Sequence, residues 1–315
     1  MLAAVFCAGH AKDAVRPPTG LYLSAPDPVA ILHPNARGTL IRVFWSQIEP
    51  SKGHFDFSPI QRQLDRVKAS KKDWSLGVVA GPHAPEWLAS EATTPTIDFN
   101  FRGTTPVRIP PQWDATVQER LRLLAKALAA EYNTDPKLRL VYVPQMSANG
   151  IEGHFNGCPK EALTRAGFIE DKWVKAVVES ATSMAKAFDS KAIAVEVHEV
   201  LGSAAAAKNI LNTLYKDKSL NGRVGAALWW LSGSSSYQPE LLHVLADFPG
   251  DKYAQVISRS DDERYFPDGA LGKVFEQAKQ LGVRYIEPWE TEFKSNRQDK
   301  LFADFQAWAD KRFPQ

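Results

Sequence analysis

Two glutamates in this sequence follow apolar, strand-like runs and are suited to acid–base chemistry. Glu152 follows the run 138–143 in a Gly-Ile-Glu-Gly-His segment, and Glu287 follows the run 283–286 and precedes a Pro-Trp pair. Two carboxyl groups can hydrolyse a glycosidic bond, because one protonates the leaving oxygen while the other attacks the anomeric carbon or activates water. We therefore predict that Glu152 and Glu287 are catalytic, with a solvated loop carboxylate as the alternative for Glu152.

A further acid–base candidate is the segment Glu196-Val-His198-Glu199, at the end of the strand-like run 192–197. Neighbouring histidine and glutamate side chains can transfer protons if burial shifts their pKa values. Side chains alternate in direction along a strand, so Glu196 and His198 share a face while Glu199 begins the loop. We assign Glu199 to the predicted site, with a hydrogen-bonded polar residue at a strand end as the alternative.

Tryptophans gather at the ends of the predicted strands: Trp45, Trp87, Trp229, Trp230 and Trp289. Ligand sites combine such aromatic side chains with a few polar groups that fix orientation. The polar residues placed for this purpose are Arg42, Gln47, His83, Gln145 and Asn149. Sugar rings offer apolar C–H faces to aromatic rings, so we predict an oligosaccharide or polysaccharide substrate. Trp229 and Trp230 point in opposite directions, and Trp229 is the one expected to face the sugar. Core packing is the alternative for any single tryptophan.

Strand-like and helix-like segments alternate along the whole chain. The predicted strands are 20–24, 40–45, 76–80, 138–143, 192–197, 224–229, 253–257 and 283–286. Eight such strands alternating with helices predict a single closed parallel barrel, (β/α)8, over residues 16–315. An open doubly wound sheet shares this alternation, but the first strand–helix turn lacks a glycine-rich phosphate loop. The long loop 90–111 is expected to act as a lid or cleft wall.

Residues 40–88 resemble the clan of (β/α)8-barrel glycoside hydrolases with β-galactosidase-like and cellulase-like members. The resemblance is carried by Arg42, Trp45, Glu49-Pro50 and Phe55-Asp-Phe57, and then by Gly81-Pro82 with Pro85, Trp87 and Leu88. It implies hydrolysis of a β-linked sugar at the carboxyl ends of the strands. It also implies that Glu152 is the general acid/base and that Trp289 stacks beneath the sugar.

The chain departs from the clan pattern at two points. The fourth strand lacks an Asn-Glu pair, and the seventh strand lacks the nucleophilic glutamate at its end. Glu287, on the eighth strand, is the substitute that we predict, with Glu199 or the run 261–263 as further candidates. A catalytically silent barrel that binds glycan, or a barrel enzyme of other chemistry, is therefore the alternative function.

The overall composition excludes several classes of protein. A net charge of +2, with no basic run longer than Lys71-Lys72, does not indicate nucleic-acid binding. Two cysteines give neither a disulfide scaffold nor metal-ligand spacing, so no metal or cofactor is expected. Residues 1–15 resemble a signal-peptide remnant, which predicts a secreted or periplasmic protein. No other segment is long and apolar enough for a membrane span.

Overall fold

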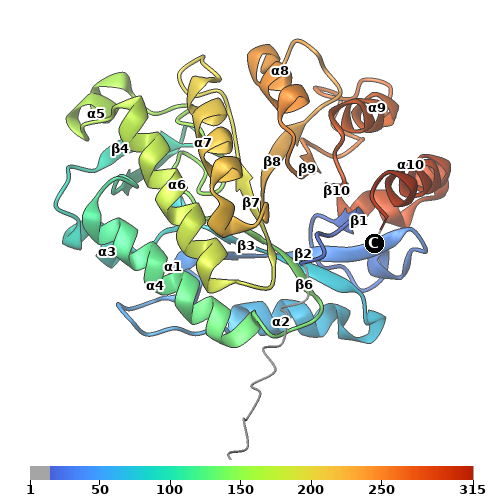
Figure 1. Cartoon of the computed structure of the whole chain (residues 1–315), viewed down its shortest axis with the longest axis horizontal. Helices are drawn as coiled ribbons and strands as arrows, with labels where there is room; N and C mark the ends of the chain where they lie inside the picture. The colour runs from blue at the N-terminus through green and yellow to red at the C-terminus, as the bar shows by residue number, and fades with distance from the viewer. Residues whose placement is uncertain (1–14, 315) are drawn as a thin grey trace, which may run out of the picture.

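The predicted strands close into one parallel barrel in the computed structural model of the chain, which describes residues 15–314 (Figure 1). Hydrogen-bonded neighbours follow the order β1-β10-β9-β8-β7-β6-β3-β2. The barrel strands are β1 (Gly20–Leu23), β2 (Ala36–Phe44), β3 (Asp73–Val79), β6 (Leu138–Tyr142), β7 (Ala192–Glu196), β8 (Val224–Leu231), β9 (Lys252–Val256) and β10 (Tyr285–Glu287). The predicted (β/α)8 fold is confirmed. The predicted signal-peptide remnant, 1–15, falls almost wholly outside the described residues.

Helices follow the strands and surround the barrel (Figure 1). The α-helices are α1 (Trp45–Ile48), α2 (Ser58–Val67), α3 (Glu86–Glu91), α4 (Ala115–Tyr132), α5 (Lys160–Arg165), α6 (Glu170–Ala187), α7 (Ala205–Lys216), α8 (Pro239–Asp247), α9 (Gly272–Leu281) and α10 (Asp299–Arg312). Asp114 caps α4, because its side chain accepts the N–H groups of Thr116 and Val117. The helices α5 and α6 are separated by a turn at Gly167, whose φ is +69°.

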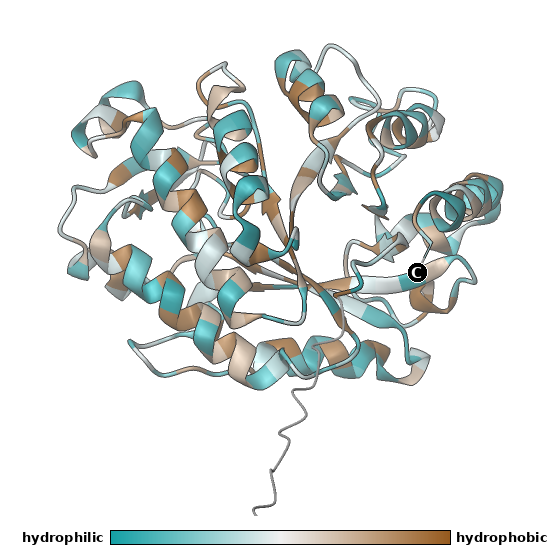
Figure 2. Ribbon diagram, in the orientation of Figure 1, coloured by the Kyte–Doolittle hydropathy of each residue, from teal (hydrophilic) through white to brown (hydrophobic). Residues whose placement is uncertain are grey.

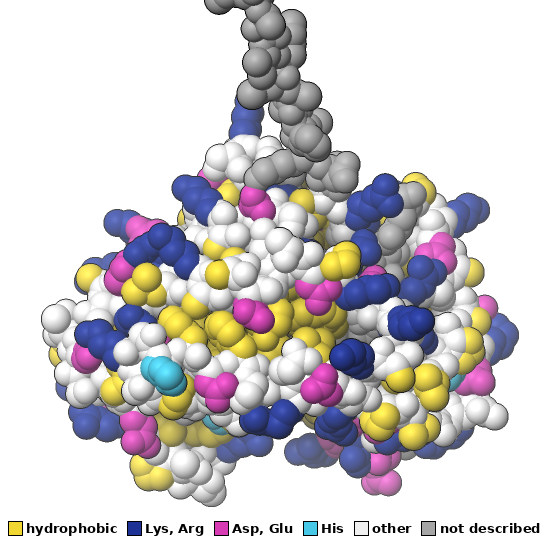
Figure 3. All heavy atoms as spheres, turned by 90° about the horizontal axis from the view of Figure 1, so that it is seen from below, with side chains coloured by type: hydrophobic (Ala, Val, Ile, Leu, Met, Phe, Trp, Pro, Cys, Tyr) yellow, Lys and Arg dark blue, Asp and Glu magenta, His cyan; other side chains and the backbone are white. Residues whose placement is uncertain are grey.

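Short 3-10 helices complete the connections: η1 (Ala30–Leu32), η2 (Lys68–Ser70), η3 (Gly81–His83), η4 (Lys218–Leu220), η5 (Glu290–Lys294) and η6 (Asn296–Gln298). Within residues 15–314, no helix has both the length and the apolar character needed to cross a membrane. On the face shown in Figure 3, acidic and basic side chains are interspersed around an apolar centre. This mixture agrees with the net charge of +2.

The alternation of side chains along the strands divides the core into two groups. One group lies inside the barrel and includes Leu140, Tyr142 and Trp229. The other fills the layer between strands and helices and includes Val141 and Trp230. Trp229 and Trp230 therefore point in opposite directions, as predicted. Figure 2 shows apolar and hydrophilic residues alternating along the outer helices, as expected for helices with one buried face.

The long loop 90–111 contains a two-stranded antiparallel hairpin that the sequence did not predict. Its strands are β4 (Ile97–Phe101) and β5 (Thr105–Ile109). The turn passes through Arg102 and Gly103, both at positive φ, which is the backbone conformation that tight hairpin turns require. The hairpin brings Phe101 and Arg102 to the wall of the cavity described below, so the loop is a cleft wall as expected.

Candidate active site

A cavity of about 700 Å³ lies at the C-terminal end of the barrel. Its position follows from the strand ends that line it, since Phe44 and Val79 are the last residues of β2 and β3 and Ile257 follows β9. The lining residues are Arg42, Phe44, Val79, His83, Phe101, Arg102, Asn149, Glu152, Trp229, Gln255, Ile257, Ser258, Arg264, Tyr265 and Trp289. This is the end of the barrel at which (β/α)8 enzymes bind their ligands.

Six of the predicted site residues line this cavity: Arg42, His83, Asn149, Glu152, Trp229 and Trp289. The Arg42 guanidinium carbon lies 5.8 Å from the centre of the Trp229 ring. The indole N–H of Trp289 donates to the carbonyl of Val256 at 3.0 Å, which fixes the ring against the end of β9. A cation and two indoles therefore share one cavity.

Trp45 and Trp87 are not part of the cavity lining, unlike the sequence-based prediction. Trp45 is fully buried, because α1 begins at this residue and turns its ring into the core. Its indole N–H donates to the Glu49 carboxylate at 2.8 Å. Trp87 donates to the Glu49 carbonyl at 3.3 Å, and its ring lies 5.4 Å from the Arg120 guanidinium. Both tryptophans therefore pack around Glu49 in the structural core.

Gln145 and Glu199 also lie away from the cavity lining. Gln145 is fully buried and its amide donates to the carbonyls of Ile151 and Glu196 at 2.7 and 2.8 Å, so it ties the loop after β6 to the end of β7. The Glu199 carboxylate accepts the N–H of Leu241 at 3.4 Å in the first turn of α8. These placements argue against direct contact of either side chain with a sugar.

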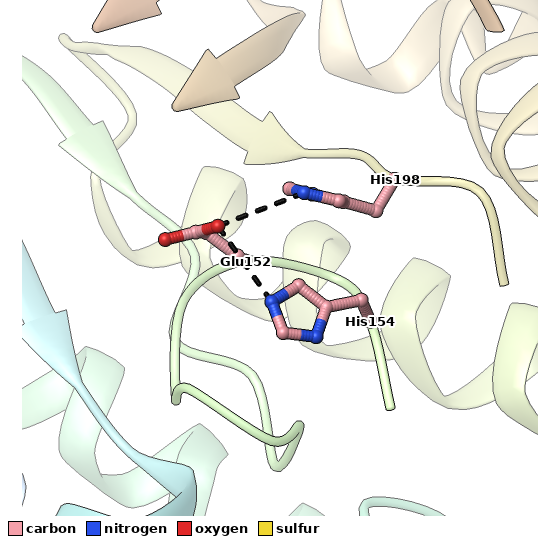
Figure 4. Close-up of side chains that lie close together, drawn as sticks. All are labelled: Glu152, His154 and His198. Atoms are coloured by element: carbon pink, nitrogen blue, oxygen red, sulfur yellow. Dashed lines mark ion pairs between the residues drawn. The ribbon is translucent and has the colours of Figure 1, made fainter. Parts of the chain in front are cut away.

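Glu152 is the carboxylate that lines the cavity, and 20% of its side chain is exposed. Asn149 donates to its Oε1 at 2.5 Å, while the Nε2 atoms of His198 and His154 lie 3.6 and 3.7 Å from its Oε2 (Figure 4). Burial opposes ionisation of Glu152. The interactions with His154 and His198 and the hydrogen bond from Asn149 outweigh this effect, and the pKa of Glu152 is lowered.

The loop that carries Glu152 is held by close backbone packing against the end of β3. Gly150 has a φ of +92°, and a Cβ atom there would lie 2.3 Å from the Ala80 carbonyl oxygen. The Ala80 N–H in turn donates to the Gly150 carbonyl at 2.8 Å. The glycine therefore permits the Glu152 loop to pack closely against the backbone after β3, and this packing holds Glu152 in position.

Glu196 and His198 form a buried pair at the end of β7 and share a face, as predicted. His198 Nδ1 lies 2.9 Å from a Glu196 carboxyl oxygen, and the N–H of Gly153 donates to the same carboxyl group at 2.6 Å. Burial, with the nearby charge of Glu152, raises the pKa of Glu196 well above its usual range. Burial lowers the pKa of His198 to about 3. Burial therefore disfavours the charged form of both groups.

Glu287, the last residue of β10, is fully buried and lies beneath the cavity. Gln255 and Tyr142 donate to its carboxyl group at 2.7 and 2.9 Å, and the Tyr285 hydroxyl donates as well. Burial raises the pKa of Glu287 to about 7, although these hydrogen bonds favour the ionised form. Gln255 lines the cavity, so a single side chain separates Glu287 from it.

Gln255 was not among the predicted site residues, because the clan carries a carboxyl group at this end of the seventh strand. Gln255 and Glu287 are register partners on β9 and β10, so the carboxyl group lies one strand beyond the clan position. Two of the further candidates in the run 261–263 form ion pairs with arginines. Asp261 pairs with Arg259 at 2.8 Å, and Asp262 pairs with Arg264 at 2.7 Å.

Among the described residues, one group of side chains has the geometry to hold a metal ion. It consists of Glu152, His154 and His198, whose ligand atoms all lie within 4.8 Å of one another. The spacing of these residues in the sequence does not indicate such a group, because two strand ends contribute to it.

Neither a protein-family model nor a curated protein sequence matches this chain. Solved structures do match. The catalytic domain of β-amylase from Paenibacillus polymyxa aligns with a TM-score of 0.64 at 10% identity, over 96% of this chain and 99% of that domain. The β-galactosidase of Rahnella sp. R3 aligns with a TM-score of 0.58 at 10% identity, over 94% of this chain but 56% of that protein.

Xylanase 10B from Thermotoga maritima aligns with a TM-score of 0.51 at 12% identity, over 86% of this chain and 82% of the xylanase. At such low identity the similarity concerns the arrangement of strands and helices. The chain therefore has the (β/α)8-barrel fold found in these glycoside hydrolases.

Proposed function

We propose that this protein is a glycoside hydrolase that cleaves a β-linked sugar in the 700 Å³ cavity, with Glu152 and Glu287 as its two carboxyl groups. The glycosidase-type barrel supports the reaction class. Trp229 and Trp289 offer aromatic faces to a sugar ring, while Arg42 and Asn149 offer hydrogen-bond donors to its hydroxyls. These features support a carbohydrate as the occupant of the cavity.

The observation that carries the proposal is the different surroundings of two carboxyl groups, since Glu152 lines the cavity beside two histidines and Glu287 is enclosed and hydrogen-bonded to Gln255. The histidines beside Glu152 lower its pKa, whereas burial raises that of Glu287 to about 7. Environments that separate the pKa values of two carboxyl groups assign one as proton donor and the other as nucleophile or base. We therefore assign Glu287 as the proton donor and Glu152 as the ionised partner. These roles are the reverse of those implied by the clan resemblance.

Contact between Glu287 and a sugar requires Gln255 to move. Glu287 has no exposed surface, and the Gln255 amide lies between its carboxyl group and the cavity. A rotation of the Gln255 side chain removes one hydrogen bond to Glu287 and leaves those from Tyr142 and Tyr285 in place.

A second candidate function is glycan binding without hydrolysis. The enclosure of Glu287 favours it, because a carboxyl group with no exposed surface does not protonate a substrate unless it becomes accessible. The glutamine at the end of β9 favours it as well, since the clan places its nucleophile on that strand.

The two functions differ in turnover. The purified protein is to be incubated with aryl β-glycosides and β-linked polysaccharides, and aglycon release is measured beside calorimetric binding of the matching oligosaccharides. If the protein is a hydrolase, it should release the aglycon from at least one substrate, and this release should require Glu152. Binding without release across the panel supports the silent barrel. If the protein neither binds nor cleaves any of these sugars, a carbohydrate is excluded as its ligand.

A further inference from the structure

The side chains of Glu152, His154 and His198 converge on one point beside the cavity (Figure 4). The Nε2 atoms of His198 and His154 lie 3.6 and 3.7 Å from the same Glu152 oxygen, Oε2. Two imidazoles and one carboxylate form a ligand set that binds zinc and similar transition metals, with a fourth position left for water. We propose that these three residues bind a divalent transition-metal ion of the zinc class, and that the bound ion inhibits hydrolysis. The inhibition rests on the proposed function, whereas the binding does not.

His198 has the surroundings of a metal-binding histidine. Its Nδ1 lies 2.9 Å from the Glu196 carboxyl group, so the other ring nitrogen, Nε2, is turned toward Glu152. Glu196 is itself fixed by the N–H groups of Gly153 and Trp229 at 2.6 and 3.3 Å. A carboxyl group behind a histidine orients the ring and strengthens its bond to a metal. His198 is therefore already oriented for metal binding in the absence of an ion.

His154 requires a small adjustment to bind. Its ring lies edge-on to that of His198, with 4.7 Å between the ring centres. Its Nδ1 accepts the main-chain N–H of Asn156 at 3.1 Å. A metal ion on Nε2 places the ring hydrogen on Nδ1, so this contact opens when the ion binds. The turn 154–156 is therefore expected to move on metal binding while β7 and His198 remain in place.

The position of the cluster explains why an occupying ion inhibits. Glu152 lines the cavity, so an ion reaches the cluster from the side that a sugar enters. Once Glu152 Oε2 coordinates a metal, that oxygen no longer reacts with a sugar or accepts a proton from water. Inhibition should therefore be reversible and should disappear when a chelator removes the ion.

Cobalt(II) is a suitable probe, because its visible absorption reports coordination independently of enzyme activity. Chelator-treated protein without a histidine tag is titrated with Co²⁺, and Zn²⁺ is then added to displace it. We expect saturation at one ion per chain. Glu152→Gln, His154→Ala and His198→Ala should lose the absorption, and Glu196→Gln should weaken Co²⁺ binding ~10–100-fold. The matched control is His54→Ala, which removes an exposed histidine outside the cluster.

Two results would overturn the binding. One is wild-type protein without saturable Co²⁺ absorption, and the other is a folded His198→Ala variant that binds as tightly as the wild type. If His198→Ala fails to fold, Glu152→Gln and His154→Ala decide, because both residues lie in a loop outside the barrel strands. Full hydrolytic activity at saturating metal would overturn the inhibition alone. Absent hydrolysis in metal-free protein would contradict the proposed function and leave the Co²⁺ titration valid.

Discussion

Gln255 and Glu287 are register partners on adjacent barrel strands, and the Gln255 amide donates to the Glu287 carboxyl group at 2.7 Å. The amide occupies the strand end where the clan carries its nucleophile, and the carboxyl group lies behind it. A buried carboxyl group beneath a movable amide is suited to holding a proton until substrate arrives.

If Glu287 is the proton donor, Glu287→Gln should lower kcat/KM by ~10²–10⁴ on substrates with poor leaving groups. The loss should be much smaller on activated aryl glycosides, which depart without protonation. Comparing the two substrate classes in the wild type and the variant measures this difference. An equal loss on both classes would argue against proton donation by Glu287.

The pH dependence of kcat/KM in the wild type should report the ionisation of Glu287. Glu287 donates only while protonated, so kcat/KM should fall as the pH rises through about 7. Glu287→Gln should lack this fall in its residual activity. The pH profiles of both proteins on one substrate with a poor leaving group provide the measurement, and a fall that persists in the variant would assign it to another group.

Stability should depend on pH through the same carboxyl group. Its pKa is about 7 in the folded protein and 4.5 ordinarily, so the folded state holds the proton more tightly. The wild type should therefore lose stability relative to Glu287→Gln as the pH rises from 4.5 to 7, by on the order of 3 kcal/mol. Urea unfolding of both proteins at several pH values measures the difference, and parallel curves would contradict the raised pKa.

The loop that carries Glu152 depends on the close approach of Gly150 to Ala80. Gly150→Ala adds a Cβ atom 2.3 Å from the Ala80 carbonyl oxygen and keeps an unfavourable positive φ. Gly157→Ala is the matched control, because Gly157 has a φ of +82° with no atom within 4 Å of its added Cβ. We expect ~1 kcal/mol of destabilisation from φ in the control and a further ~1–3 kcal/mol in Gly150→Ala. Equal unfolding midpoints would show that the packing against β3 is unimportant.

The sequence predicts the barrel well because each strand is a short apolar run followed by a helix-forming segment. It predicts the site less well, because the position of a residue after a strand does not determine where its side chain points. Trp45 and Trp289 both follow strands, but α1 begins at Trp45 and turns its ring into the core. Trp289 instead follows a proline, has an extended backbone conformation and lines the cavity.

Contacts between distant segments are the other part that local patterns do not reveal. The hairpin of β4 and β5 supplies Phe101 and Arg102 to the cavity, yet its strands contain polar residues and a proline, so they do not form apolar runs that stand out from the loop. Gln255 was passed over because its importance depends on Glu287, 32 residues away. Glu196 and His198 could be paired by strand alternation alone.

The most direct test of hydrolysis in this cavity compares the wild type, Glu152→Gln and Glu199→Gln on the best substrate of the panel. Glu199 is the matched control, because it follows a barrel strand but contacts the first turn of α8 instead of the cavity. We predict that Glu152→Gln lowers turnover by at least ~10² on poor and activated leaving groups alike, while Glu199→Gln retains wild-type turnover. A wild type that binds oligosaccharide without cleaving it, or a Glu152→Gln variant as active as the wild type, would contradict the proposal.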